Sequence, residues 1–470
     1  MNTFTTNMQL VYILAAACFV VGLHLMNSPA TARRGNQVST AGMIIAVIAT
    51  LVLLIKDGTV TGIGWAVLIV GALLGSGVGL WSARTVQMTA MPQLVSMFNA
   101  VGGGAAALVA IYGYMHDESA PGGVLGTTSV FTVLDVIIGS VTFTGSLIAA
   151  GKLQGVISGS PVMIKGGRAI NAALAAIALG AGAFMFTTAS LPALLIVVLA
   201  SLAFGVMMVL PIGGADMPVV ISLLNAFTGT AVAMAGFVIG NWALIVAGAL
   251  VGASGGILTK LMADAMNRSL ANIVIGGFGT GDSAVPVAVS GDAQIRSIAA
   301  DDAAIQLAYA SKVIIVPGYG LAAAQAQHGV AELAQVLEDR GVEVSYAIHP
   351  VAGRMPGHMN VLLAEANVPY PQLKEMDEIN PEFPRADVAL VIGANDVTNP
   401  AARRPGTAIS GMPILDVDQA KSIIVVKRSM GHGYAGIDNE LYTNPKTSMY
   451  FADAKKAVAE MTAAVKTLVG

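Results

Sequence analysis

Apolar segments long enough to cross a membrane fill the first 262 residues, and they constrain the fold more than any other feature. A bilayer core of ~30 Å needs about 20 apolar residues in a helix. Nine segments qualify: residues 8–26, 37–55, 61–80, 92–114, 129–151, 170–187, 191–210, 217–239 and 241–261. Only 11% of the 470 residues are charged, against roughly 25% in soluble proteins. We therefore expect a polytopic α-helical membrane bundle.

The composition changes near Asp282, where charges and prolines begin to occur at the density of a soluble protein. We predict a transmembrane domain over residues 1–262, a hinge over 263–282 and a cytoplasmic domain over 283–470. The net charge of −3 is too small to indicate a nucleic-acid partner. The single cysteine, Cys18, excludes a disulfide framework and a cysteine-based metal site, and we expect no metal.

Basic residues flank the spans unevenly, and this bias predicts the orientation of the chain. The odd-numbered connections carry most of them: Arg33, Arg34, Arg84, Lys152, Lys165 and Arg168. The first span lacks a basic n-region and a clear cleavage site, so we expect a true span and not a signal peptide. Together these features predict an N-terminus outside and a C-terminal domain in the cytoplasm.

We single out five polar residues within or directly before the predicted spans and refer to them as the polar seam: Asn99, Asp135, Ser146, Asp216 and Asn225. Ionisable groups at membrane depth usually face the bundle interior or a water-filled path. Each also has a simpler interpretation, because asparagines bond helices together and Asp216, shortly before Pro218, suits a helix N-cap. As a set they predict a path for protons.

Strands and helices alternate in the C-terminal part. We expect strands at 312–318, 342–350, 386–396 and 421–429, and helices at 320–340, 357–368 and 452–468. This alternation predicts an α/β Rossmann-like, doubly wound domain with a parallel sheet, whose ligands bind at the carboxyl ends of the strands.

Gly318 and Gly320 follow the first of these strands and precede a helix, with the small residue Ala323 third in the pattern. Glycines in this context let backbone amides approach a dinucleotide pyrophosphate. A tight strand–helix turn also requires glycine, so both interpretations stay open. The glycine cluster at 275–283 precedes no helical pattern and is assigned to the hinge, which leaves one dinucleotide site.

The charges around this site favour NADP over NAD. An NAD site usually has an acidic residue after the second strand, but here that strand ends in His349 and Pro350. Instead Lys427, Arg428 and Ser429 follow the fourth strand, and two cations with a hydroxyl suit a ribose 2′-phosphate. The alternative is an ordinary exposed basic loop.

Long motifs now point to a family. The sequences GGADMPVV, VTFTGS, MNRS, PGYG, HPVAGRMPGHMNVLLAEA, EMDEIN, IGAND, NPAA, KRSM and GYAG together resemble the β subunit of proton-translocating NAD(P) transhydrogenase. The resemblance implies an NADP(H)-binding domain and most of a membrane domain on this chain. It also implies an α partner with the NAD(H) domain and further spans, and a dimer of αβ units. The expected location is the lipid bilayer of the bacterial inner membrane.

The resemblance further assigns roles to matching residues. Asn395 and Asp396 are expected at the reacting nicotinamide, with Asp396 linking protonation to nucleotide binding. Cofactor contacts are expected from Gly318, Tyr319, Gly320, Val351, Ala352, Gly353, Arg354, Met355, Pro356, Gly393, Ala394, Asn395, Asp396, Val397, Lys427, Arg428, Ser429, Gly433, Tyr434, Ala435, Gly436, Asp453 and Ala454. The nucleotide is reversed in this family, so Gly320 is expected to contact another part of it than an ordinary fingerprint glycine does.

One position departs from the family pattern. Some members have a proton-carrying histidine where this chain has Asn99, and asparagine does not titrate. We expect a histidine of the α partner to replace it; the alternative is that Asp216 or Asp135 titrates.

Two rival functions remain open at this point. One is a secondary transporter whose cytoplasmic domain senses NADP(H). The other is a membrane-anchored dehydrogenase using Tyr319 or His349 as an acid–base group.

Overall fold

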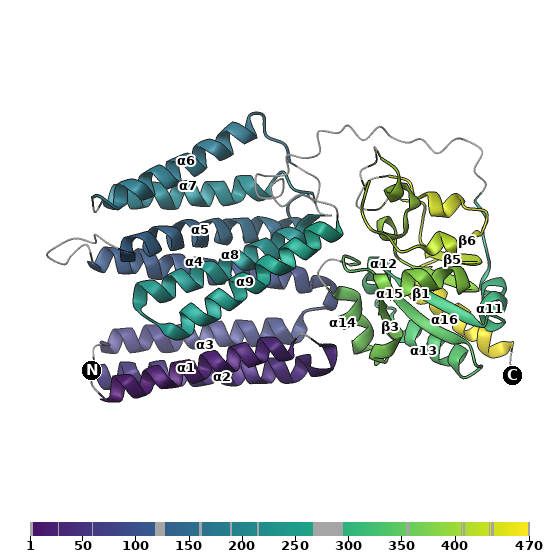
Figure 1. Ribbon diagram of the computed structural model, residues 1–470, viewed down its shortest axis with the longest axis horizontal. Coiled ribbons are helices and arrows are strands. Elements are labelled where there is room, and N and C mark those ends of the chain that lie inside the picture. The colour runs from purple at the N-terminus through teal and green to yellow at the C-terminus, as the bar shows by residue number, and fades with distance from the viewer. Residues whose placement is uncertain are drawn as a thin grey trace. The chain divides into compact units, whose positions relative to one another are not determined.

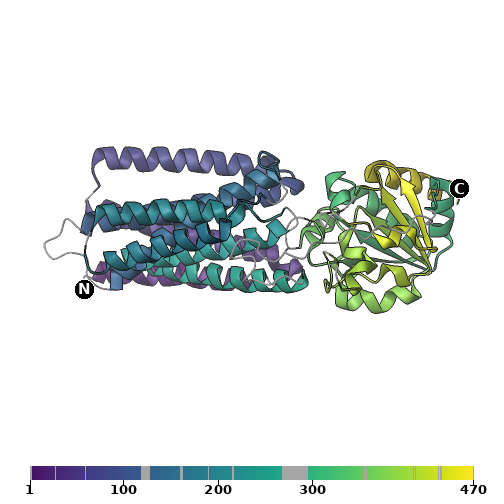
Figure 2. The same ribbon diagram turned by 90° about the horizontal axis from the view of Figure 1, so that it is seen from above.

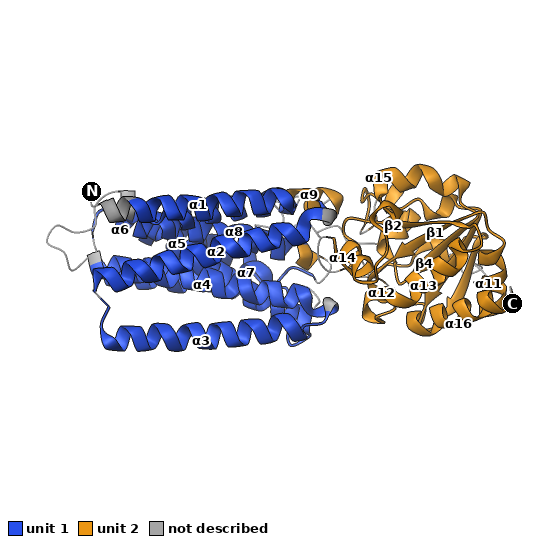
Figure 3. Cartoon of the chain, turned by 90° about the horizontal axis from the view of Figure 1, so that it is seen from below, with its two compact units in different colours: residues 1–213, 219–259, 274–277 blue, residues 214–218, 260–273, 278–470 orange. Residues whose placement is uncertain are grey.

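The computed structural model describes residues 3–26, 28–58, 60–117, 127–158, 162–188, 190–213, 216–266, 295–353, 357–405, 407, 409–431, 433 and 437–468. The chain separates into two compact units, coloured in Figure 3. Unit 1 comprises residues 1–213, 219–259 and 274–277, and unit 2 comprises residues 214–218, 260–273 and 278–470. Each unit is described by itself.

Nine helices of the described chain are long and apolar enough to cross a membrane, which confirms the predicted bundle. They are α1 (Thr3–Leu25), α2 (Pro29–Asp57), α3 (Gly62–Thr85), α4 (Met91–Asp117), α5 (Thr127–Gln154), α6 (Gly167–Met185), α7 (Leu191–Val209), α8 (Met217–Ile239) and α9 (Trp242–Ala265), labelled in Figure 1. A short 3-10 helix, η1 (Met88–Ala90), precedes α4. Helix α2 begins eight residues before its apolar segment because Pro29 suits a first helical turn.

Small residues bring α4 and α5 into close contact. A Cβ atom added to Gly139 of α5 would lie 2.6 Å from the carbonyl oxygen of Gly103 on α4, and one added to Gly103 would lie 2.8 Å from Cβ of Thr142. Helices in lipid associate through this kind of close backbone packing, because lipid tails are as apolar as leucine side chains. The α4–α5 contact therefore depends on glycine at both positions.

Helix α3 lies at the edge of unit 1 and apart from its other helices, as Figures 2 and 3 show from two sides. None of its residues is buried. Its apolar surface is thus left uncovered by the described helices of the same unit.

A six-stranded parallel sheet forms the centre of the described part of unit 2, in the order β3-β2-β1-β4-β5-β6. The strands are β1 (Lys312–Pro317), β2 (Glu343–Ile348), β3 (Leu373–Glu375), β4 (Val388–Ile392), β5 (Ser422–Lys427) and β6 (Thr447–Phe451). The four predicted strands and their parallel arrangement are confirmed. The strands β3 and β6 at the two edges were not predicted.

The helices of unit 2 are α11 (Ala300–Ala308), α12 (Tyr319–Ala323), α13 (Gln327–Glu338), α14 (His358–Glu365), α15 (Met376–Ile379) and α16 (Ala454–Thr467). The 3-10 helices are η3 (Tyr370–Gln372), η4 (Asn380–Arg385), η5 (Asp396–Thr398), η6 (Pro400–Arg403), η7 (Val417–Gln419) and η8 (Glu440–Thr443). Helix α16 packs against α11 and α13. An apolar core extends from the sheet to Phe383 and Tyr442.

The expected single helix over residues 320–340 is wrong. Two helices, α12 and α13, occupy this stretch, and they are separated at residues 324–326. Gln325 there has φ 51°, in the left-handed region, where an α-helix cannot continue. The helix after the glycine turn therefore has only five residues.

Candidate functional site

The carboxyl ends of β1, β4 and β5 lie side by side, because these three strands are parallel neighbours in the sheet. The segments that leave them carry 11 of the 23 residues predicted to bind the cofactor. These segments are 317–320 after β1, 393–396 after β4 and 427–433 after β5. The strand order thus gathers three segments at one edge of the sheet, although the first and second are 73 residues apart in sequence and the second and third are 31 residues apart.

The turn after β1 packs directly on the backbone of the loop after β4. The amide of Gly318 donates to the carbonyl of Ile392 at 2.9 Å, and that of Gly320 donates to the carbonyl of Gly393 at 3.0 Å. A Cβ atom on Gly320 would lie 2.6 Å from Cα of Gly393, which itself has φ 70°. The glycines are therefore required by this backbone contact, and both amides already have protein partners. Their contact with a nucleotide stays a prediction.

Asn395 is fixed by two residues from a later segment that sequence reasoning missed. The hydroxyl of Tyr442 donates to Oδ1 of Asn395 at 2.9 Å. Nδ2 of Asn439 donates to the carbonyl of Asn395 at 3.0 Å and lies 3.1 Å from its Oδ1. Both partners belong to the stretch IDNELYTN, in which the only local signal is an asparagine before a 3-10 turn. The arrangement holds the loop after β4 in one conformation.

Lys427, the last residue of β5, lies beside this network. Its Nζ donates to the carbonyl of Gly431 at 2.5 Å and sits 4.4 Å from the ring centroid of Tyr442. Burial lowers the pKa of Lys427, although Asp396 and Asp438 act in the opposite direction. Burial also raises the pKa of Tyr442, so its hydroxyl keeps its proton and can donate to Asn395.

The two residues after Lys427 are exposed. Oγ of Ser429 accepts from the amide of Gly431 at 3.5 Å. The segment thus combines one half-buried cation with an exposed guanidinium, Arg428, and an exposed hydroxyl. This donor set suits a phosphate group.

Gly433 lies against Asp396. A Cβ atom on Gly433 would lie 2.7 Å from Cγ of Asp396, so only glycine fits opposite this carboxylate. The remaining predicted residues of that segment, Tyr434, Ala435 and Gly436, lie outside the described residues, as do Arg354, Met355 and Pro356.

His349 organises the segment that follows β2. It is 2% exposed, Nε2 lies 2.8 Å from the carbonyl of Pro413, and Nδ1 accepts from the amide of Val351 at 3.2 Å. Burial lowers the pKa of His349 to about 4, against the opposing effect of the Pro413 carbonyl. The imidazole is therefore neutral near pH 7, with both nitrogens engaged. Ala352 is buried, and Gly353 has φ 103° beside His358.

The other predicted contacts have structural roles in the described chain. Ala394 and Val397 pack on the core of the sheet. Asp453 caps α16, with Oδ1 accepting from the amide of Lys455 at 3.0 Å, and Ala454 is buried behind it. Tyr319 is half-buried, with its ring 6.5 Å from that of His358.

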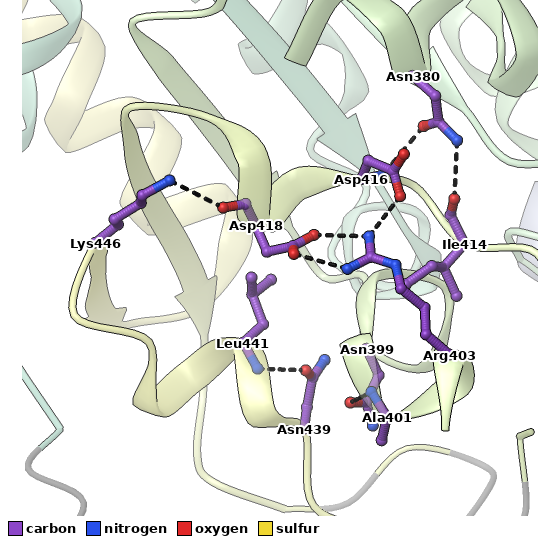
Figure 4. Close-up of polar contacts among 10 residues, drawn as sticks. All are labelled: Asn380, Asn399, Ala401, Arg403, Ile414, Asp416, Asp418, Asn439, Leu441 and Lys446. Carbon is purple, nitrogen blue, oxygen red and sulfur yellow. Dashed lines mark hydrogen bonds and ion pairs between the residues drawn. The ribbon is translucent and has the colours of Figure 1, made fainter. Parts of the chain in front are cut away.

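Side-chain bonds outside the predicted set anchor the segments around the site, as Figure 4 shows. Arg403 pairs with both oxygens of Asp418, at 2.7 and 2.9 Å, and with Asp416 at 2.5 Å. Asn399 donates to the carbonyl of Asp438 at 3.0 Å and accepts from the amide of Ala401 at 3.1 Å. The connection between β4 and β5 is thus bonded to itself through Arg403, and the chain after residue 436 is bonded to it through Asn399.

The polar seam of unit 1 contains hydrogen bonds between helices. Nδ2 of Asn99 on α4 donates to the carbonyl of Ile221 on α8 at 3.3 Å, which agrees with the simpler interpretation of Asn99. The carbonyl of Ser146 accepts from Ser96 at 2.8 Å. Asn225 is half-buried within α8, and Asp216 immediately precedes that helix.

The residues at the carboxyl edge fit a phosphorylated nucleotide. They supply Lys427 and Arg428 as cations, the hydroxyl of Ser429, and a surface at Gly393 and Gly433 where a side chain would collide with its neighbours. Among the described residues, no group of three or more His, Cys, Asp or Glu side chains could hold a metal ion.

Comparison with known proteins identifies the family. A family described as NAD(P) transhydrogenase beta subunit matches residues 8–464. Two relatives named NAD(P) transhydrogenase subunit beta, from Rhodospirillum rubrum and from a designated strain of that species, are each 47% identical over 460 residues. The alignment covers 97% of this chain and 98% of each relative. A match of this extent, on a membrane bundle joined to a Rossmann-like sheet, shows that the chain belongs to the NAD(P) transhydrogenase beta subunit family.

Proposed function

We propose that the carboxyl edge of the sheet in unit 2 binds NADP(H), and that Lys427, Arg428 and Ser429 hold its 2′-phosphate. The observation that carries this proposal is the position of these residues at the end of β5, beside the Asn395–Tyr442 network. The described chain has no acidic residue directly after β2, where an NAD site would place one. Membership of the family implies use of NAD(P)(H) and, from the designation beta, an alpha partner.

The protein's task in this reaction is to position and shield the reacting ring. A nicotinamide supplies the hydride chemistry, which needs no protein nucleophile or metal. Tyr442 and Asn439 hold Asn395, and Gly433 covers Asp396. Both features favour a fixed ring and a site with little water. Since the described part of the chain offers one such site, the second nicotinamide, that of NAD(H), is held by the alpha partner.

Proton movement through unit 1 is proposed to set the affinity of unit 2 for NADP(H), with residues 263–282 as the hinge between domains 1–262 and 283–470. Asp396 is the carboxylate that links protonation to nucleotide binding. A charge moving through the membrane potential gains ~2.3 kcal/mol per 100 mV, and linked binding changes of about 1–3 kcal/mol are ordinary. The two energies are therefore of matching size.

The proposed assembly is a dimer of αβ units in a lipid bilayer, the bacterial inner membrane, with the N-terminus outside and unit 2 in the cytoplasm. The excess of basic residues in odd-numbered connections supports this orientation. A transporter with an NADP(H) sensor is not favoured by the family match. The dehydrogenase alternative needs an acid–base residue, and neutral His349 has both nitrogens occupied.

The experiment is a nucleotide titration of the αβ complex with Lys427→Ala and Arg428→Ala variants. Loss of one charge-assisted bond costs about 1.5–3 kcal/mol, so we expect NADPH affinity to fall about 10- to 100-fold while NADH affinity barely changes. Lys421→Ala is the matched control, because Lys421 lies just before the other end of β5, where it pairs with Asp387. Equal losses for both nucleotides, or a wild-type preference for NADH, would contradict the proposal.

A further inference from the structure

Asp135 is an acidic residue in the middle of a membrane-spanning helix. The other acidic residues within the nine described helices, Asp57, Asp117 and Asp264, lie at or next to helix ends. The side chain of Asp135 on α5 is 0% exposed, and neither carboxylate oxygen has a hydrogen-bond partner. Because it does not reach the surface of the bundle, a helix of a partner subunit cannot supply the missing donor.

Apolar packing contacts flank Asp135 on both sides along α5. One turn earlier, the ring of Phe131 stacks on that of Phe237 on α8, with 4.5 Å between the ring centroids. One turn later, Gly139 packs on Ala107 of α4. Asp135 therefore lies between α4 and α8, whose facing side chains include the buried alanine cluster of Ala106, Ala231 and Ala235.

The titratable groups of the packed helices have other positions or partners. They are Tyr112, Tyr114, His116 and Asp117 on α4, Lys152 on α5 and Arg168 in the first turn of α6, whereas α7 and α8 have none. Tyr112 stacks on His116, the hydroxyl of Tyr114 accepts from the amide of Ser190, and Lys152 donates to the carbonyls of Leu210 and Ile212. Asp117 is the last residue of α4. Without a neighbouring cation, the only ligand that removes the charge of Asp135 is a proton.

A second unpartnered polar group lies on the same face of α5. Ser146 is 0% exposed and its Oγ has no partner. It follows Asp135 by eleven residues, about 16 Å along the helix axis. Between them, buried Thr142 donates to the carbonyl of Ile138 at 2.7 Å. Buried polar atoms without partners are rare, and a transiently bound water or ion is one established explanation for them.

We propose that Asp135 is the proton-binding group of this bundle, and that protons pass between it and Ser146 along α5. The inference rests on the proposed function. The amide of Asn99 cannot titrate, and the inference places the titrating group on this chain, at Asp135, instead of on the expected histidine of the α partner. The carboxylate gains a proton from water on one side and releases the same proton toward the other, with no change in oxidation state. The close contact of α4 and α5 at Gly103 and Gly139 closes the path between Asp135 and Ser146 in this structure. Proton exchange along α5 therefore requires these two helices to separate.

The test uses the αβ complex in sealed vesicles, with an Asp135→Asn variant and a Ser201→Ala control. Ser201 on α7 is also buried with an unpartnered hydroxyl, but it lies outside the proposed path. We expect Asp135→Asn to reduce proton uptake during NADH-driven NADP⁺ reduction about 100-fold. Single-turnover hydride transfer between bound nucleotides should change less than about twofold. The control should retain both activities.

Infrared difference spectra between NADP⁺- and NADPH-loaded complexes give a second measurement. A protonated-carboxyl band should be present in wild type and Ser201→Ala, absent in Asp135→Asn, and shifted in Asp135→Glu, which should keep proton uptake. If the Asp135→Asn protein does not assemble, the Asp135→Glu protein provides the test. A shifted carboxyl band with retained proton uptake supports the inference, and an unshifted band contradicts it. Wild-type coupling with an unchanged spectrum in Asp135→Asn would overturn the inference. Wild-type hydride transfer without any proton flux would instead refute the proposed function.

Discussion

At the scale of single residues, the hydroxyl of Tyr442 connects two parts of the site that the sequence keeps apart. It donates to Asn395 after β4 and lies 3.4 Å from Nζ of Lys427 at the end of β5. The ring beneath contributes a cation–π contact of 4.4 Å. Tyr442 is therefore a positioning residue for Lys427, which we propose binds the phosphate, and for the loop after β4, which we propose lies at the nicotinamide.

The variant Tyr442→Phe separates these contributions, because it keeps the ring and removes only the hydroxyl. A neutral hydrogen bond contributes about 0.5–1.5 kcal/mol, so we expect NADPH affinity of the αβ complex to fall about 3- to 10-fold. Titration calorimetry measures this change. Tyr450→Phe, which removes a hydroxyl bonded to Glu460, should leave the affinity unchanged. A Tyr442→Phe protein with wild-type affinity would show that the bond to Asn395 has no role in binding.

His349 gives unit 2 a defined pH response. The pKa of an exposed histidine, about 6.5, falls to about 4 in the folded protein because the ring is buried. Folding therefore excludes a proton. The free energy of unfolding should be constant above about pH 6.5 and should decrease as the pH falls toward about 4, by roughly 3 kcal/mol in total.

Hydrogen exchange of strand β2 in the full chain measures this effect. Protection should drop between about pH 7 and about pH 5, after correction for intrinsic exchange, and this drop should disappear in His349→Asn. The exposed His328 on α13 provides the control, since His328→Asn should keep the wild-type pH dependence. A His349→Asn protein with the wild-type slope would assign the response to other groups.

At the scale of elements, patterns with many residues were predictable and individual turns were not. The nine spans and four central strands follow from long apolar or β-branched runs, whose period and length are local properties. The short edge strand β3 has only three residues, none of them buried, so it has no apolar run to detect. The bonds of Asn439 and Tyr442 to Asn395 join residues more than 40 positions apart, and no local pattern encodes such contacts.

The division between α12 and α13 illustrates the limit most clearly. The run LAAAQAQHGVAELAQVLE has high helix propensity, yet Gln325 adopts φ 51°. Tertiary contacts override the local preference there: the short α12 continues from a turn bonded to Gly393. Propensity is a weak prior in such a case.

The left-handed backbone conformation of Gln325 leads to a testable prediction. A β-branched side chain is strained in the left-handed region, so Gln325→Val should destabilise unit 2 by about 1–2 kcal/mol. Gln325→Gly should be neutral or stabilising. Proteolysis rates of the full chain, compared at equal temperature, would rank the stabilities of these variants. Ala324→Val, next to it at φ −83°, should have a smaller effect, and equal sensitivity at both positions would argue against strain.

At the scale of the whole molecule, two kinds of fold correspond to the two kinds of chemistry that we propose. The helices of unit 1 keep Asp135 from water and lipid, whereas the sheet of unit 2 concentrates cations and glycines at one edge. The family was predictable from the motifs, and the two kinds of fold were predictable from composition and periodicity. The position of Asp135 between α4 and α8 became clear only from packing.

The strand order has a consequence for synthesis. Strand β1 pairs with β4, about 70 residues later, and Asn395 finds its partners only at Asn439 and Tyr442. A ribosome releases the chain from its N-terminus, so all nine helices leave it before the last of these partners. The proposed nucleotide site is therefore completed last, after the half with the membrane-spanning helices has already been made.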